Sequence, residues 1–92
     1  WVSSTTSHRL DLAPLVARAR EMGSLVGVDV TQAAGLLPYD CRSPAVDFTI
    51  STSLKWMCGT PGAGILHVAP ALIADCEPEL RGWFSQPDPF NW

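Results

Sequence analysis

The chain has 92 residues, of which 47 % are hydrophobic and only 16 % are charged, whereas an average globular chain carries about 25 % charged residues. This composition excludes a disordered protein. It also supplies little polar sequence to cover the apolar surface of a lone small domain. We therefore expect residues 1–92 to be a truncated piece, taken from the interior of a larger domain.

The net charge is −3, and the six basic residues are scattered singly along the chain. A phosphate backbone or an anionic lipid surface needs a basic patch, so we expect neither nucleic acid nor membrane as a partner. The apolar runs are far shorter than the ~20 residues that span a bilayer, and no signal-peptide pattern opens the chain. These features predict a cytoplasmic protein.

Three cysteines and two histidines are the candidate metal ligands. Cys41, Cys58 and Cys76 form no CxxC pair, and His8 and His67 share no ligand spacing with them. We predict reduced thiols and no metal site, with His67 a satisfied core histidine.

Apolar residues recur at helical spacing from Leu12 to Met22, with Asp11 placed to cap the helix and Gly23 to end it. Short apolar runs predict strands, and the other expected elements are strands at 1–4, 25–30, 45–51 and 65–68, a short helix at 32–37 and a helix at 70–76. The first two or three strands should be parallel, and the last should be antiparallel because only a loop precedes it. This order predicts an α/β fold, with residues 77–92 as an irregular segment leading out of it.

Three polar side chains follow expected strands: Asp29 closes the strand at 25–30, Gln32 lies three residues beyond it, and Lys55 follows the strand at 45–51. Taken singly, an Asp at a strand end commonly caps a helix, and a Lys or Gln in a loop is commonly solvated. Open α/β sheets, however, bind ligands beyond the carboxyl ends of their strands. A carboxylate, an amide and an amine at that edge together suit pyridoxal phosphate.

Each of the three groups has a task toward that cofactor. A carboxylate keeps the ring nitrogen protonated, so that the ring can act as an electron sink. An amide donates to the ring hydroxyl oxygen, and a lysine amine forms the Schiff base. Hydroxyl groups and backbone N–H groups would hold the phosphate, and Ser51, Thr52 and Ser53 supply hydroxyls next to Lys55.

Four segments closely resemble the class V aminotransferase family of fold type I pyridoxal-phosphate enzymes, which includes kynureninases and cysteine desulfurases. The first is the motif D-x-x-Q-A-x-G-x-x-P-x-D from Asp29 to Asp40. The others are Val46-Asp47-Phe48, Ser51-Thr52-Ser53-Leu54-Lys55-Trp56 and Gly59-Thr60-Pro61-Gly62-Ala63-Gly64. The resemblance implies that the chain is the central part of the large cofactor-binding domain, with a mostly parallel sheet and covering helices.

The resemblance also implies residue roles. Asp29 would pair with the pyridinium nitrogen, Gln32 would contact the ring hydroxyl, and Lys55 would carry the aldimine. Leu54 stands where cysteine desulfurases have His and kynureninases have Tyr, so phosphate anchoring shifts to Thr52, Ser53 or groups outside this chain.

Near the end, Trp83 resembles the Trp of a kynureninase Gly-Trp pair and is a further phosphate candidate. Gln86 stands where kynureninases carry a substrate-reading His. The resemblance places Ser4, Thr5 or Thr6 near the ring hydroxyl.

The leading hypothesis is a pyridoxal-phosphate enzyme that acts on an amino acid, most like a kynureninase-related hydrolase or a transaminase, and homodimeric in its full length. A cysteine desulfurase or lyase is the first alternative. The second is a cofactor-free α/β binding fragment in which Asp29 and Lys55 form an ion pair. Because the small domain and the substrate-carboxylate arginine of the family have no counterpart here, we expect the 92-residue chain alone to be inactive.

Overall fold

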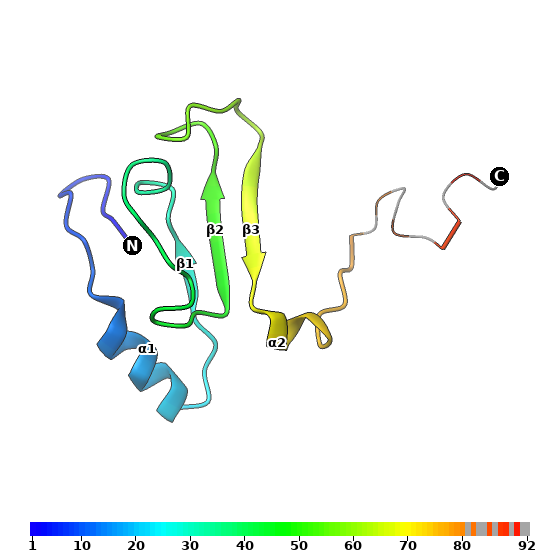
Figure 1. The fold of residues 1–92 in the computed structure, drawn as a ribbon, viewed down its shortest axis with the longest axis horizontal. Coiled ribbons are helices and arrows are strands. Elements are labelled where there is room, and N and C mark those ends of the chain that lie inside the picture. Colours follow the sequence, from blue (N-terminus) through cyan, green and yellow to red (C-terminus); the bar gives the residue numbers. More distant parts are fainter. Residues whose placement is uncertain (81, 83–84, 86, 89, 91–92) are drawn as a thin grey trace.

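The computed structural model describes residues 1–80, 82, 85, 87–88 and 90. Figure 1 shows its elements, which in chain order are α1 (Leu12–Glu21), β1 (Gly27–Asp29), β2 (Phe48–Thr52), β3 (Gly64–Val68) and α2 (Pro70–Ile73). The structure combines helices with one small mixed sheet, which is consistent with the predicted α/β class.

The three strands form one sheet in the order β1-β2-β3. β1 and β2 are parallel and pair Val28 with Thr49, whereas β2 and β3 are antiparallel and pair Thr49 with His67. The parallel pairing of the strands expected at 25–30 and 45–51 and the antiparallel last strand are as predicted. The sheet is mixed, however, and not mostly parallel as the resemblance implied. The carboxyl ends of β1 and β2 therefore lie at the same edge of the sheet, beside the 53–63 connection (Figure 1).

The helix α1 lies beside β1 (Figure 1), and its apolar side chains pack toward one face of the sheet. The Asp11 side chain caps it by accepting a hydrogen bond from the Ala13 N–H at 3.0 Å, as predicted from the sequence. Its two buried residues pack against apolar side chains of the sheet and its approaches, and the resulting core consists of Leu12, Val16, Val26, Val28, Val30 and Val46. The sequence periodicity therefore identified the helix, but its buried face is narrower than the apolar spacing indicated, because Leu15 and Met22 are exposed.

A partly buried ion pair joins α1 to the start of β2. The Arg20 guanidinium donates to both carboxylate oxygens of Asp47, at 2.7 and 3.0 Å, and the Val26 N–H donates to the same carboxylate at 2.7 Å. Hydrogen bonding to Arg20 lowers the pKa of the Asp47 carboxyl. One carboxylate thus holds together the helix and the entries to two neighbouring strands.

Two predicted elements are wrong. Residues 1–4 form no strand of the sheet, because Val2 makes only a single bridge, to Arg9. Residues 32–37 form successive turns and no helix. The Val30 carbonyl accepts hydrogen bonds from the N–H groups of Ala33 and Ala34, which closes a tight turn, and Gly35 has a φ of +88°, which ends a helix. The last helix is also shorter than predicted, and the described residues after 76 lie in neither α-helix nor strand.

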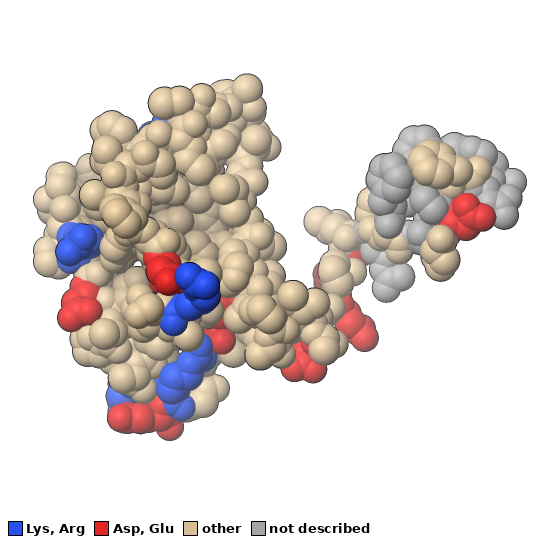
Figure 2. Space-filling model, in the orientation of Figure 1, with Lys and Arg blue, Asp and Glu red and all other residues tan. Residues whose placement is uncertain are grey.

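The opposite face of the sheet is open and apolar. Ile50 pairs with Leu66 there, and the two residues are 48 % and 66 % exposed. On the face seen in Figure 2, charged side chains gather over and near α1, and few lie at the end with the 53–63 connection. Among the described residues, no helix combines the length and apolar character needed to cross a membrane.

Candidate functional site

The predicted carboxylate and amide lie together at the carboxyl edge of β1. Asp29 is the last residue of that strand, and Gln32 follows in the turn. Both line a cavity of about 380 Å³, whose lining residues are Trp1, Val2, Ser3, Ser4, Asp29, Thr31 and Gln32. This volume lies within the range of small-molecule sites, and most of the lining side chains carry a carboxylate, amide or hydroxyl group.

The Asp29 side chain is exposed and has one partner among the described residues. Its Oδ1 accepts a hydrogen bond from the Thr31 N–H at 2.7 Å, which fixes the orientation of the carboxylate at the strand end. The structure gives Oδ2 no donor within the described part of the chain. A carboxylate held by one oxygen and open at the other can accept a hydrogen bond from a protonated ligand nitrogen.

Lys55 lies in the 53–63 connection between β2 and β3. Two hydrogen bonds of Ser53 join the two ends of this connection. The Ser53 N–H donates to the Ala63 carbonyl at 3.0 Å, and its hydroxyl donates to the Thr60 carbonyl at 2.7 Å. Lys55 is exposed in the bend, and its carbonyl accepts from the Cys58 N–H at 3.0 Å. Because the Ser53 hydroxyl proton is directed to Thr60, this side chain meets a phosphate only if that bond changes.

Two contacts hold the 53–63 connection that carries Lys55 (the lysine connection) against the turn that carries Gln32. The Thr52 N–H donates to Thr31 Oγ1 at 3.1 Å. A Cβ on Gly35 would lie 2.7 Å from the Trp56 carbonyl oxygen, so this approach requires glycine. Lys55 does not itself line the 380 Å³ cavity, but these contacts fix its connection beside the Asp29 edge.

Sequence reasoning missed Thr31 and the physical role of Gly35. Gly35 belongs to the recognised motif, yet its contact with Trp56 depends on two segments meeting in space. Thr31 gave a weaker signal, as a hydroxyl residue between the strand-end Asp29 and Gln32.

Of the other residues predicted to contact the cofactor, some lie at the cavity and others do not. Ser4 lines the cavity, whereas Thr5 and Thr6 do not, and their N–H groups donate to Ser3 Oγ. Thr52 is exposed beside the lysine connection. Trp83 lies outside the described residues. Asp29 and Lys55 form no ion pair with each other within the described chain, so the contact assumed in the cofactor-free alternative is not formed.

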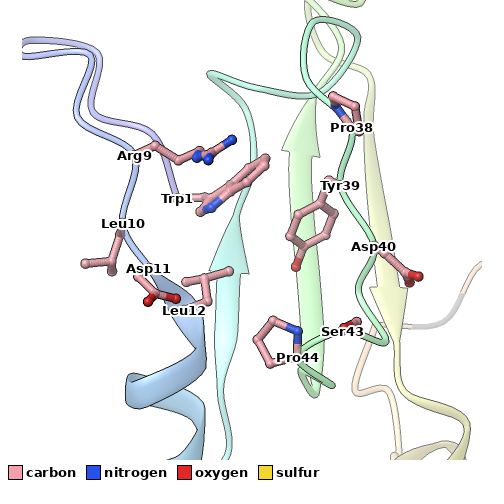
Figure 3. A pocket seen from close by; sticks show the side chains of 10 residues that line it. All are labelled: Trp1, Arg9, Leu10, Asp11, Leu12, Pro38, Tyr39, Asp40, Ser43 and Pro44. Carbon is pink, nitrogen blue, oxygen red and sulfur yellow. The ribbon is translucent and has the colours of Figure 1, made fainter.

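A second cavity, of about 480 Å³, lies between the first residues and the 38–44 segment (Figure 3). The Trp1 and Tyr39 rings lie 5.2 Å apart there, and the Arg9 guanidinium lies 5.8 Å from the Trp1 ring. Its two carboxylates already have partners, because Asp11 caps α1 and Asp40 binds Arg42. None of the predicted site residues within the described part of the chain lines it.

A third cavity, of about 500 Å³, lies over β2 and β3 and is lined by Cys41 and His67. The Cys41 sulfur lies 3.7 Å from His67 Nε2, while the buried Nδ1 of His67 has no hydrogen-bond partner among the residues that the structure describes. His67 is therefore only half satisfied, contrary to the prediction. Cys41, Cys58 and Cys76 are free thiols, and no group of three or more metal-ligating side chains occurs among the described residues.

The sequence of the chain is similar to those of known enzymes. The family model of class V aminotransferases matches residues 1–86. Isopenicillin N epimerase of Streptomyces clavuligerus is 35 % identical over 86 residues, which cover 94 % of this chain and 22 % of that protein. A probable cysteine desulfurase of Streptomyces coelicolor is 37 % identical over 81 residues, covering 88 % of this chain and 19 % of that protein.

Kynureninase of Xanthomonas axonopodis pv. citri is 35 % identical over 81 residues, covering 86 % of this chain and 19 % of that protein. The chain thus spans about a fifth of the length of these curated relatives. The similarity covers Asp29, Gln32 and Lys55, because the family match runs through all three positions.

Proposed function

Because the chain belongs to the class V aminotransferase family, we propose that it is part of the large, cofactor-binding domain of a fold type I pyridoxal-phosphate enzyme that acts on an amino acid. The observation that carries this proposal is the carboxyl edge of the sheet. Asp29 and Gln32 line one cavity there, and the connection with Lys55 is bonded to the same turn.

The donor set of this edge fits the cofactor. Asp29 has a carboxylate oxygen without a donor among the described residues, and it would hold the proton on the pyridine nitrogen. Gln32 would orient the ring through its hydroxyl oxygen, and Lys55 would supply the amine that bonds the cofactor's aldehyde. When bound, the cofactor supplies an electron sink for a carbanion at the substrate α-carbon. Lys55 would then carry the proton to and from that carbon.

The phosphate would be held near the lysine connection. Thr52 is exposed at the end of β2 and can donate its hydroxyl. Ser53 would join it after releasing its bond to the Thr60 carbonyl, and Trp83 is the third proposed contact. Of these three residues, Thr52 is the one whose exposed position next to the site supports its proposed contact with the phosphate.

The reaction is proposed as hydrolysis of a kynurenine-like amino acid or as transamination. The similarity to a kynureninase supports the first, and the family match supports the second. A cysteine desulfurase or lyase reaction is the alternative, because a probable desulfurase is 37 % identical to the chain, against 35 % for the kynureninase. We further propose that the full-length enzyme is a homodimer in the cytoplasm, where three unpaired thiols suit a reducing compartment.

Titration of the full-length protein with pyridoxal phosphate tests the cofactor proposal. A visible absorption band should appear in the unaltered protein and be absent from Lys55→Ala, because the band requires the lysine amine. Substitution of the exposed Arg18, whose side chain pairs with Glu21 on α1, is the control, and Arg18→Ala should keep the band. Absence of a band in the unaltered protein would refute the proposal. Assays with kynurenine, cysteine and amino-acid and keto-acid pairs then identify the reaction.

A further inference from the structure

The hydrogen bonds between the backbones of β1 and β2 are followed, at the carboxyl ends of the strands, by a hydrogen bond to the Thr31 side chain. The Val30 N–H donates to the Ile50 carbonyl at 2.9 Å, as a parallel pair requires. The Val30 carbonyl does not continue this pairing with β2, because it accepts hydrogen bonds from two N–H groups of the following turn, both at 2.8 Å. The Thr52 N–H donates instead to Thr31 Oγ1, at 3.1 Å. The Thr31 hydroxyl thus supplies the last connection between the two strand ends.

The same residue contacts both halves of the proposed site. The Thr31 N–H donates to Asp29 Oδ1 at 2.7 Å, and Thr31 lines the 380 Å³ cavity with Asp29 and Gln32. Thr52, its partner across the gap, lies three residues before Lys55. Thr31 therefore links the carboxylate that would hold the ring nitrogen to the segment that would supply the amine.

We propose that Thr31 is a positioning residue, whose hydroxyl oxygen fixes the end of β2 relative to the Asp29 carboxylate and so sets the placement of Lys55 against the cofactor. The inference rests on the proposed function. A backbone acceptor would be fixed by the sheet itself, whereas this acceptor depends on one side chain, so that a single substitution can remove it.

The hydrogen bond itself is tested without cofactor, by amide hydrogen exchange in the full-length protein. Thr31→Val keeps the branched shape and removes the acceptor, so the Thr52 amide should exchange about fivefold to tenfold faster. Thr31→Ser retains the hydroxyl and should keep the exchange within about twofold of the unaltered protein. The Val30 amide, bonded to Ile50, is the internal control and should not change in either variant.

The positioning role is tested by cofactor binding to the same variants. Thr31→Val should weaken the affinity for pyridoxal phosphate about tenfold and reduce the Lys55-dependent absorption band, and Thr31→Ser should restore both. If Thr31→Val also releases the Val30 amide, Thr31→Ala takes its place in both measurements. Restoration by serine separates the hydroxyl's role from a general loss of packing.

Two outcomes would overturn the inference. Unchanged Thr52 exchange in Thr31→Val would show that the hydroxyl does not hold the strand end. Faster exchange with unchanged cofactor affinity and band would show that the bond exists but positions nothing. A missing band in the unaltered protein would instead refute the proposed function, and the exchange measurement would still report on the hydrogen bond.

Discussion

Two carboxylates bind arginines of α1, but they differ in burial. The Asp47 side chain is 9 % exposed and binds Arg20, whereas Glu21 is 65 % exposed and binds Arg18. Asp47→Ala removes the acceptor of Arg20 and of the buried Val26 N–H, so we expect it to lower the free energy of unfolding by about 2 kcal/mol. Glu21→Ala is the matched control and should change it little, because exposed pairs contribute little. Urea denaturation at pH 7 measures both.

The same pair predicts a pH dependence. Hydrogen bonding to Arg20 lowers the pKa of Asp47 in the folded state below its ordinary value of 3.8. Its contribution to stability is therefore fully present above the ordinary value and is lost as the pH falls through the lowered folded-state pKa. The stability difference between the unaltered protein and Asp47→Ala should stay constant from pH 7 to about pH 5 and shrink below pH 4. A difference that shrinks on raising the pH would contradict this assignment.

Among the turns, Gly35 allows the segment after β1 to pack against the lysine connection. Gly35 and Gly62 have nearly the same φ, +88° and +86°, but only Gly35 has backbone atoms close to where a Cβ would lie. Gly62→Ala should therefore cost about 1 kcal/mol of stability, the conformational penalty alone. Gly35→Ala should cost at least about 1 kcal/mol more, because the Trp56 carbonyl must move.

Denaturation of both glycine variants separates these two costs. In the full-length protein, cofactor titration should also show a weaker absorption band for Gly35→Ala, since the lysine connection shifts with Trp56. Equal losses of stability in the two variants would show that the close approach contributes nothing.

The elements that were predicted correctly depend on local sequence. Asp11 and the apolar spacing define α1, and the loop before β3 indicates an antiparallel strand. The helix expected at 32–37 failed because the Val30 carbonyl begins a tight turn and Gly35 adopts a positive φ. The strand expected at 1–4 failed because a strand is defined by its partner, and Val2 pairs only with Arg9.

The candidate site follows the same division. Asp29, Gln32 and Lys55 could be predicted, because residue type and order along the chain point to one chemistry at one sheet edge. The Thr31 and Gly35 contacts could not, since each joins residues 21 positions apart in the chain. The Arg20–Asp47 pair, 27 positions apart, was missed for the same reason.

The molecule as a whole is flat and exposes much apolar surface. Its shortest extent is 18 Å, whereas the longest, 52 Å, includes the chain after α2, which runs away from the sheet (Figure 1). The shortest extent leaves room for the sheet and one covering layer. The apolar side chains of Ile50 and Leu66 on the open face are thus available to a second surface.

This open face predicts how the 92-residue chain behaves by itself. Leu66 is 66 % exposed among apolar neighbours on the edge strand β3, whereas Leu10 is 44 % exposed away from the sheet. The chain should self-associate, and Leu66→Lys should weaken that association about tenfold, because a buried leucine contributes ~1.5–3 kcal/mol. Leu10→Lys carries the same change of charge and should have a much smaller effect. Sedimentation velocity over a range of concentrations measures both.

The same substitution distinguishes a covered face from one that stays open in the full-length protein. If further chain covers β3, Leu66→Lys places a charge in an apolar contact and should lower the stability of the full-length protein by several kcal/mol. Leu10→Lys again serves as the control. A full-length protein that tolerates Leu66→Lys as well as Leu10→Lys would show that the face remains open, and the low charge content would then have another cause than coverage of this sheet.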